Sequence, residues 1–158
     1  LLRQPGTGTG KKPASEQAGL AVAMPAMRKL SLLLVCLWAG LIFYLSHQPG
    51  TLVQPLFPQQ DKLLHFTAYA ILGFLGMGSM RAMAHGYRPQ QAWLVCLLVG
   101  LYGITDEFHQ YFIPGRTVDG FDVMADIAGG MLGTWLLYYL VRRASRRRQL
   151  QAGQAGSD

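Results

Sequence analysis

Residues 30–46, LSLLLVCLWAGLIFYLS, form an apolar run without a single charged side chain. At 1.5 Å per residue, a helix over this run extends about 25 Å, which is most of the hydrocarbon thickness of a bilayer. Three further runs of similar length and apolar character lie at 63–80, 92–112 and 121–141. The sequence therefore predicts an all-α protein, a four-helix transmembrane bundle.

Composition favours a membrane bundle over a soluble fold. The chain is 51% hydrophobic and only 14% charged, whereas soluble domains are roughly 25% charged. Its 158 residues suffice for one domain. Four apolar runs in so short a chain leave almost no polar surface for a soluble protein, so the partner that we expect around the helices is the lipid bilayer.

The basic residues predict the orientation. Only Lys62 and Arg116 lie in the first and third connections, and the other twelve Lys and Arg lie near the termini or in the second connection. The positive-inside rule therefore places both termini in the cytoplasm. The run RRASRRR, residues 142–148, directly follows an apolar run. We interpret it as a topology signal in contact with anionic lipid rather than as a nucleic-acid site.

Three regions follow from these patterns. Residues 1–27 are predicted to be a disordered cytoplasmic segment, because they are rich in Gly, Ala and Lys without periodicity. Met24 or Met27 would be a natural start, which would make the residues before it an upstream addition. Residues 28–143 form the membrane domain, and residues 144–158 form a basic cytoplasmic tail.

The acidic residues gather in one short stretch. DEFHQYFIPGRTVDGFDVMAD, residues 106–126, holds five of the eight acids. In the predicted topology it joins the outer ends of the third and fourth helices, and the second helix begins on the same side. We therefore predict an extracytoplasmic polar pocket. Its candidate residues are Asp61, Lys62, His65, Asp106, Glu107, His109, Gln110, Arg116, Asp119, Asp122 and Asp126.

Helical spacing supports convergence of these side chains. Asp119, Asp122 and Asp126 follow i, i+3, i+7, which places them on one face if the helix begins that early. Similar stripes are Asp61, His65 and Tyr69 on the second helix, and Asp106, His109 and Gln110 on the third. A row of small residues, Ala125, Gly129 and Gly133, predicts close helix packing. His47, in contrast, is predicted to lie in a solvated loop.

Two motifs resemble the VanZ-like family of small bacterial membrane proteins. They are DKLLHFTAYAILGF, residues 61–74, and DEFHQYFIPGRTVDGFDVMADIAGGMLG, residues 106–133. The shared pattern is Asp-Lys-x-x-His, Asp-Glu-x-x-Gln, Pro-Gly-Arg and a final Asp-x-x-x-Asp or Asp-x-x-x-Asn, and it spans roughly residues 32 to 140. Asp126 stands where many relatives carry Asn, which adds one negative charge.

The family is named for a protein associated with teicoplanin resistance. The resemblance thus implies a multi-pass protein of the bacterial cytoplasmic membrane that is linked to cell-envelope function or glycopeptide resistance. It implies no particular reaction.

Three interpretations of the cluster remain open. In the first, the protein is an enzyme that acts on a lipid-linked or phosphate-bearing envelope substrate. Clustered carboxylates raise one another's pKa, and a histidine can carry protons near neutral pH. A divalent cation bound by Asp and His would also fit. The candidate catalytic residues are Asp106, Glu107, His109, Asp122 and Asp126.

In the second interpretation, the pocket binds a lipid-linked cell-wall precursor or a glycopeptide without catalysis. Arg116 is suited to bidentate binding of a phosphate or carboxylate. The candidate binding residues are Asp61, Lys62, His65, Gln110, Arg116 and Asp119. In the third, Lys62 and Arg116 only neutralise carboxylates and connect helices. Six acids then face two basic residues and two histidines, so that interpretation leaves negative charge uncompensated.

Overall fold

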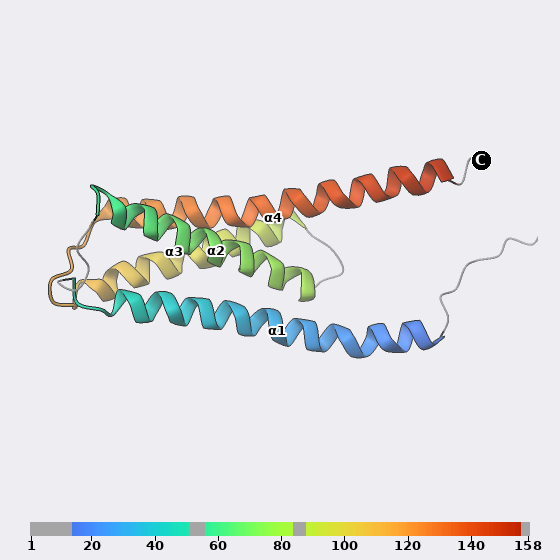
Figure 1. Cartoon of the computed structure of the whole chain (residues 1–158), viewed down its shortest axis with the longest axis horizontal. Coiled ribbons are helices and arrows are strands. Elements are labelled where there is room, and N and C mark those ends of the chain that lie inside the picture. Colours follow the sequence, from blue (N-terminus) through green and yellow to red (C-terminus); the bar gives the residue numbers. More distant parts are fainter. Residues whose placement is uncertain (1–13, 51–55, 84–87, 156–158) are drawn as a thin grey trace, which may run out of the picture.

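The computed structural model of the chain describes residues 14–50, 56–83 and 88–155. These contain four helices and no strand: α1 (Ala14–Ser46), α2 (Gln60–Met83), α3 (Pro89–Gln110) and α4 (Gly120–Ala155). Successive helices run in opposite directions, as Figure 1 shows. The all-α prediction of four helices is confirmed. We call the end where α1 and α3 finish and α2 and α4 begin the polar end.

Three of the described helices are long and apolar enough to cross a membrane, over Lys29–Ser46, Gln60–Met80 and Gly120–Gln154. Helix α3, the fourth predicted span, falls short of this test because its last two turns include Asp106, Glu107 and His109. The surface of the bundle supports a lipid environment. Large apolar side chains point outward on all four helices, and Phe108 is 67% exposed. A water-soluble protein rarely exposes continuous apolar surface of this extent.

Two helices, α1 and α4, extend more than ten residues beyond the predicted spans. Helix α1 begins at Ala14, so helix replaces the predicted disorder between residues 14 and 27. Five of the fourteen residues there are Ala and two are Met, and both types have high helix propensity even without an amphipathic pattern. Residues 1–13 lie outside the described part of the chain. Helix α4 continues to Ala155, so most of the basic tail is helical.

The closest helix packing joins α2 to α4, as the row of small residues predicts. A Cβ atom at Gly133 would overlap the Ala70 carbonyl oxygen, and one at Gly129 would overlap the carbonyl oxygen of Phe66. Glycine therefore brings the two backbones into direct contact, which is the usual device where lipid offers no hydrophobic driving force for association. This contact sets the distance between the first turns of α2 and α4.

Helix α1 is attached to the other helices by side chains that donate to backbone carbonyls. Trp38 Nε1 donates to the Ala68 carbonyl oxygen at 2.9 Å, and the Tyr102 hydroxyl donates to the Ala39 carbonyl oxygen at 2.7 Å. In an apolar surrounding such bonds have no competing water. They fix the position of α1 beside α2 and α3, and hence the position of its C-terminal end.

Candidate functional site

Polar side chains from three helices meet at the polar end. We call this group the acidic cluster. Figure 1 shows that the first turns of α2 and α4 lie at the same end as the last turns of α3. The members of the acidic cluster are Lys62 and His65 of α2, Glu107 of α3, Asp119 of the α3–α4 loop, and Asp122 and Asp126 of α4.

The deepest contact of the acidic cluster joins His65 to Asp126. His65 Nδ1 lies 3.0 Å from Asp126 Oδ1, and Asp126 is 0% exposed. When Asp126 is ionised its carboxylate can only accept hydrogen bonds, and in that state His65 Nδ1 carries the proton. The other oxygen, Asp126 Oδ2, has no hydrogen-bond partner among the described residues.

Lys62 neutralises the outer rim of the acidic cluster. Its Nζ lies 2.6 Å from Asp119 Oδ2 and 3.2 Å from Asp122 Oδ1. The hydrogen bond from this ammonium holds the pKa of the Asp119 carboxyl below its usual range. Asp61, at 3.3 Å from Lys62 Nζ, has a side chain that is 58% exposed. Asp61 therefore lies at the margin and not within the buried group.

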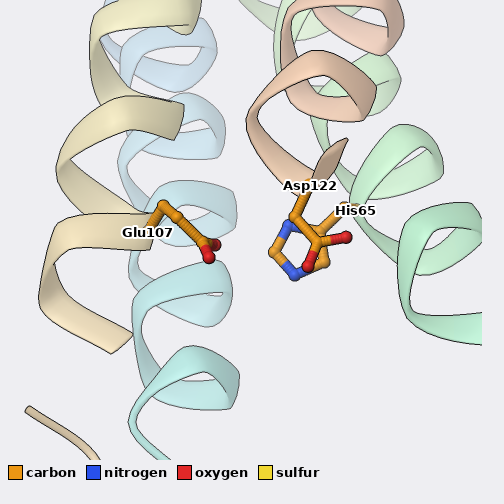
Figure 2. Close-up of side chains that lie close together, drawn as sticks. All are labelled: His65, Glu107 and Asp122. Atoms are coloured by element: carbon orange, nitrogen blue, oxygen red, sulfur yellow. The ribbon is translucent and has the colours of Figure 1, made fainter. Parts of the chain in front are cut away.

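Glu107 reaches across from α3 toward the other two helices. Its Oε1 accepts a hydrogen bond of 2.6 Å from the backbone N–H of Asp119, which ties the α3–α4 loop to α3. Glu107 is only 4% exposed, and its Oε2 has no partner among the described residues. Figure 2 shows its carboxylate directed toward His65 and Asp122. One possible ligand atom from each of these three residues lies within 4.8 Å of the others.

Asp106 and Gln110 face α1. Ser46 Oγ donates to Asp106 Oδ2 at 2.8 Å, and Gln110 Nε2 makes longer contacts with Ser46 Oγ at 3.4 Å and with Asp106 Oδ2 at 3.5 Å. Ser46 is absent from the candidates predicted from the sequence, because a serine that ends an apolar helix is ordinary. The buried Tyr69 hydroxyl, near Asp106 and Asp126, has no hydrogen-bond partner among the described residues.

His109 lies apart from the acidic cluster. Its Nε2 is 3.2 Å from His47 Nδ1, and its ring packs on Phe43 with 4.7 Å between ring centroids. The sequence grouped His109 with the acids and treated His47 as a solvated loop residue. The structure instead pairs the two histidines, and it gives His109 no contact with a candidate catalytic carboxylate within the described residues.

Arg116 is also turned away from the carboxylates. Its Nε donates to the Gln48 carbonyl oxygen at 3.1 Å, and its Nη2 donates to the Leu45 carbonyl oxygen at 2.9 Å. The last carbonyls of a helix lack intrahelical partners and carry partial negative charge, so they attract a cation. The backbone N–H of Gly50 donates to the Pro114 carbonyl oxygen at 3.2 Å. We call this region the Arg116 corner, and its residues are Leu45, Gln48, Gly50, Pro114 and Arg116.

Comparison with models of protein families identifies the family of the chain. The family model described as VanZ/LLP1 matches residues 31–142. The chain belongs to the VanZ/LLP1 family. The match runs through all four helices and includes both the acidic cluster and the Arg116 corner. No curated protein matched the chain, and no solved structure matched it either.

In this VanZ/LLP1 protein, negative charge exceeds the positive charge available to it. Lys62 and His65 can compensate two carboxylates, and four acids are buried: Asp106, Glu107, Asp122 and Asp126. Three of these four retain an oxygen without a partner among the described residues. Such oxygens accept hydrogen bonds from a ligand, coordinate a cation, or exchange a proton with a bound substrate.

Proposed function

We propose that this VanZ/LLP1 membrane protein uses the acidic cluster to bind a cell-envelope component and thereby lowers susceptibility to teicoplanin-type glycopeptides. In this proposal it is a multi-pass protein of the bacterial cytoplasmic membrane, with both termini in the cytoplasm and the polar end at the outer face. The observation that carries the proposal is that Glu107 and Asp126 each have a buried carboxylate oxygen without a hydrogen-bond partner in the part of the chain that the structure describes.

A cluster that served only to connect helices would satisfy its own buried atoms. Leaving a buried polar group without a partner costs about 1–3 kcal/mol. Arg116 shows that this chain can provide partners for a polar side chain at the same end, since its Nε and Nη2 donate to the carbonyl oxygens of Gln48 and Leu45. The partnerless oxygens therefore favour a ligand that brings hydrogen-bond donors or positive charge. Peptide N–H groups and sugar hydroxyls of wall precursors and glycopeptides supply such donors.

The charge distribution supports the proposed orientation. The arginines of the α4 tail lie at the end of the bundle opposite the polar end (Figure 1) and are exposed. They are Arg142, Arg143, Arg146, Arg147 and Arg148. The positive-inside rule assigns that end to the cytoplasm, so the acidic cluster would face the envelope.

Antibiotic susceptibility of cells that express the protein tests the proposal. We expect the full chain to raise the inhibitory concentration of teicoplanin in a susceptible bacterium. Glu107→Gln and Asp122→Asn should abolish that increase at equal membrane abundance. Phe108→Leu is the matched control, because Phe108 adjoins Glu107 but points outward. An unchanged inhibitory concentration with the wild-type chain would contradict the proposal.

A second function is favoured by the His65–Asp126 pair. A histidine whose Nδ1 is held by a carboxylate can accept a proton at Nε2, and Glu107 lies beside it as a possible acid. This arrangement would suit a membrane enzyme acting on a lipid-linked or phosphate-bearing envelope substrate. Mass analysis of lipid-linked precursors before and after incubation with the protein separates the two functions. A product of changed mass supports the enzyme, and a complex with unchanged precursor supports the binder.

A further inference from the structure

We infer that His65, Glu107 and Asp122 bind a divalent transition-metal ion between α2, α3 and α4. The inference rests on the proposed function, since it takes the acidic cluster as a ligand site and names its inorganic component. Three observations carry it: the mutual distances of the ligand atoms, the partner of His65, and the unused oxygen of Glu107.

The distances suit an ion with little rearrangement. The three ligand atoms lie within 4.8 Å of one another, and Figure 2 shows the imidazole and the two carboxyl groups meeting between the helices. Ligands bound at about 2.0–2.2 Å from a metal are about 3 to 4 Å apart. Small rotations of the Glu107 and Asp122 side chains would close that difference, and no backbone shift is needed.

The contact with Asp126 fixes the orientation of the His65 ring. His65 Nδ1 lies 3.0 Å from Asp126 Oδ1, and in the tautomer whose Nδ1–H donates to an ionised Asp126, Nε2 is the nitrogen with a free lone pair. A carboxylate that holds the far nitrogen of a metal-binding histidine is a recurrent arrangement, because it sets the tautomer and raises ligand basicity. Asp126 would be a positioning residue here and not a ligand.

Glu107 supplies the independent observation. It is buried, it points into the group, and its Oε2 has no partner among the described residues. Its Oε1 is already held by the Asp119 N–H, so the carboxylate is fixed with one oxygen in reserve. Asp122 is also held through one oxygen, because Lys62 Nζ donates to its Oδ1 at 3.2 Å. A neighbouring group thus holds one atom of each of the three residues.

The donor set indicates the class of ion. One imidazole and two carboxylates suit Zn²⁺ or Mn²⁺ better than Mg²⁺ or Ca²⁺, which prefer oxygen alone, and better than metals that require thiolates. Two carboxylates would balance the charge of a divalent ion. Three protein ligands leave a coordination position for water or for an oxygen of the envelope ligand.

Measuring the metal content of the full chain tests the inference. The chain is first purified in detergent and its metal ions are removed with a chelator. After equilibration with Zn²⁺ or Mn²⁺ alone, we expect about one ion per chain by elemental analysis. Glu107→Gln and Asp122→Asn should lower the affinity by about 100-fold or more, and Asp126→Asn by about 10–100-fold. Phe108→Leu is the matched control. It changes the residue next to Glu107 on the same helix, but the Phe108 side chain points outward, so binding should be retained.

Wild-type protein that binds neither ion would overturn the inference, and so would folded Glu107→Gln protein that binds as tightly as wild type. If the variants fail to fold, electron paramagnetic resonance of Mn²⁺ on the wild-type chain decides. Coupling to an imidazole nitrogen supports His65 as a ligand, and its absence contradicts it. Teicoplanin protection by metal-free protein would end this inference alone. A bound metal without any effect on susceptibility would end the proposed function alone.

Discussion

The acidic cluster and the Arg116 corner lie at the same end of the bundle, and the chain links them within a dozen residues, yet they differ in how their polar groups are satisfied. In the Arg116 corner, two guanidinium nitrogens donate to the carbonyl oxygens of Leu45, in α1, and Gln48, just beyond it. In the acidic cluster, buried oxygens of Glu107 and Asp126 remain without partners among the described residues. The polar contacts of the corner lie within the chain, whereas the cluster keeps buried oxygens that the ligand we propose would engage.

Helix electrostatics sharpen this contrast. Asp61 and Asp122 lie in first turns of helices, where the helix dipole favours negative charge. Glu107 lies near the C-terminal end of α3, where the dipole disfavours an acid. Arg116 has the opposite sign and lies at the C-terminal end of α1, where the dipole favours it. Glu107 is thus the acid whose position local helix stability explains least and a ligand site explains best.

The largest expected effect comes from removing the partner of Asp126. His65→Leu should destabilise the protein by about 3 kcal/mol, because it leaves a buried carboxylate uncompensated. The double variant His65→Leu, Asp126→Leu should recover most of that loss, since apolar replacement of a buried pair is often neutral. Thermal unfolding in detergent measures both. The double variant should still lack metal binding and glycopeptide protection, and retention of either would make the pair structural only.

Breaking the α2–α4 contact should disturb both regions together. Gly133→Val inserts atoms into the backbone of Ala70 and should cost about 2–3 kcal/mol. The control is Gly40→Val, because a Cβ at Gly40 meets nothing within 4 Å. Folded yield and unfolding temperature report the difference. Equal stability of the two variants would show that the glycine row does not hold α2 against α4.

Arg116→Gln should affect the Arg116 corner and leave the acidic cluster unchanged. It removes charge-assisted hydrogen bonds to the end of α1, and we expect a loss of about 1–2 kcal/mol. Metal bound per folded chain should stay near the wild-type value, because Arg116 donates to the Leu45 and Gln48 carbonyl oxygens and not to a carboxylate among the described residues. The variant could instead be as stable as wild type and no longer protect against teicoplanin. That result would show that Arg116 binds the ligand, as the sequence first suggested.

The smallest effect should come from Asp61→Asn. Asp61 is largely exposed and only shares Lys62 with Asp119 and Asp122. Exposed ion pairs contribute little, so stability should change by less than about 0.5 kcal/mol. Chemical denaturation with repeated measurements can detect a change of that size. A loss of stability comparable to that of His65→Leu would show that Asp61 belongs to the acidic cluster.

The sequence predicts the helices well and the site only in part. The apolar runs locate α1 to α4, and the small-residue row locates the contact of Gly129 and Gly133 with α2. The motif residues also identify His65, Glu107 and Asp122 as neighbours at one end. The helix from Ala14 to residue 27 escapes prediction, because it depends on intrinsic propensity without an amphipathic pattern.

The partners of Arg116 and His109 could not be predicted from the sequence for another reason. Charge alone suggested that Arg116 would meet carboxylates, and spacing suggested that His109 would join Asp106. Arg116 instead donates to the carbonyls of Leu45 and Gln48, and His109 contacts His47. Each of these partners lies more than sixty residues away along the chain. Ser46 likewise carries no signal in the sequence that would distinguish it from any serine at a helix end.

Hydropathy is a sum over consecutive residues, so the amino-acid order alone establishes that there are four helices and that their acids gather at one end. Pairing depends on how each helix is rotated, and a shift of one residue turns a side chain by about 100°. Only the packing of α1 to α4 settles that Asp126 contacts His65 and that Glu107 Oε2 has no partner among the residues that the structure describes. The glycine contacts fix those rotations, because backbones that touch leave little freedom to turn.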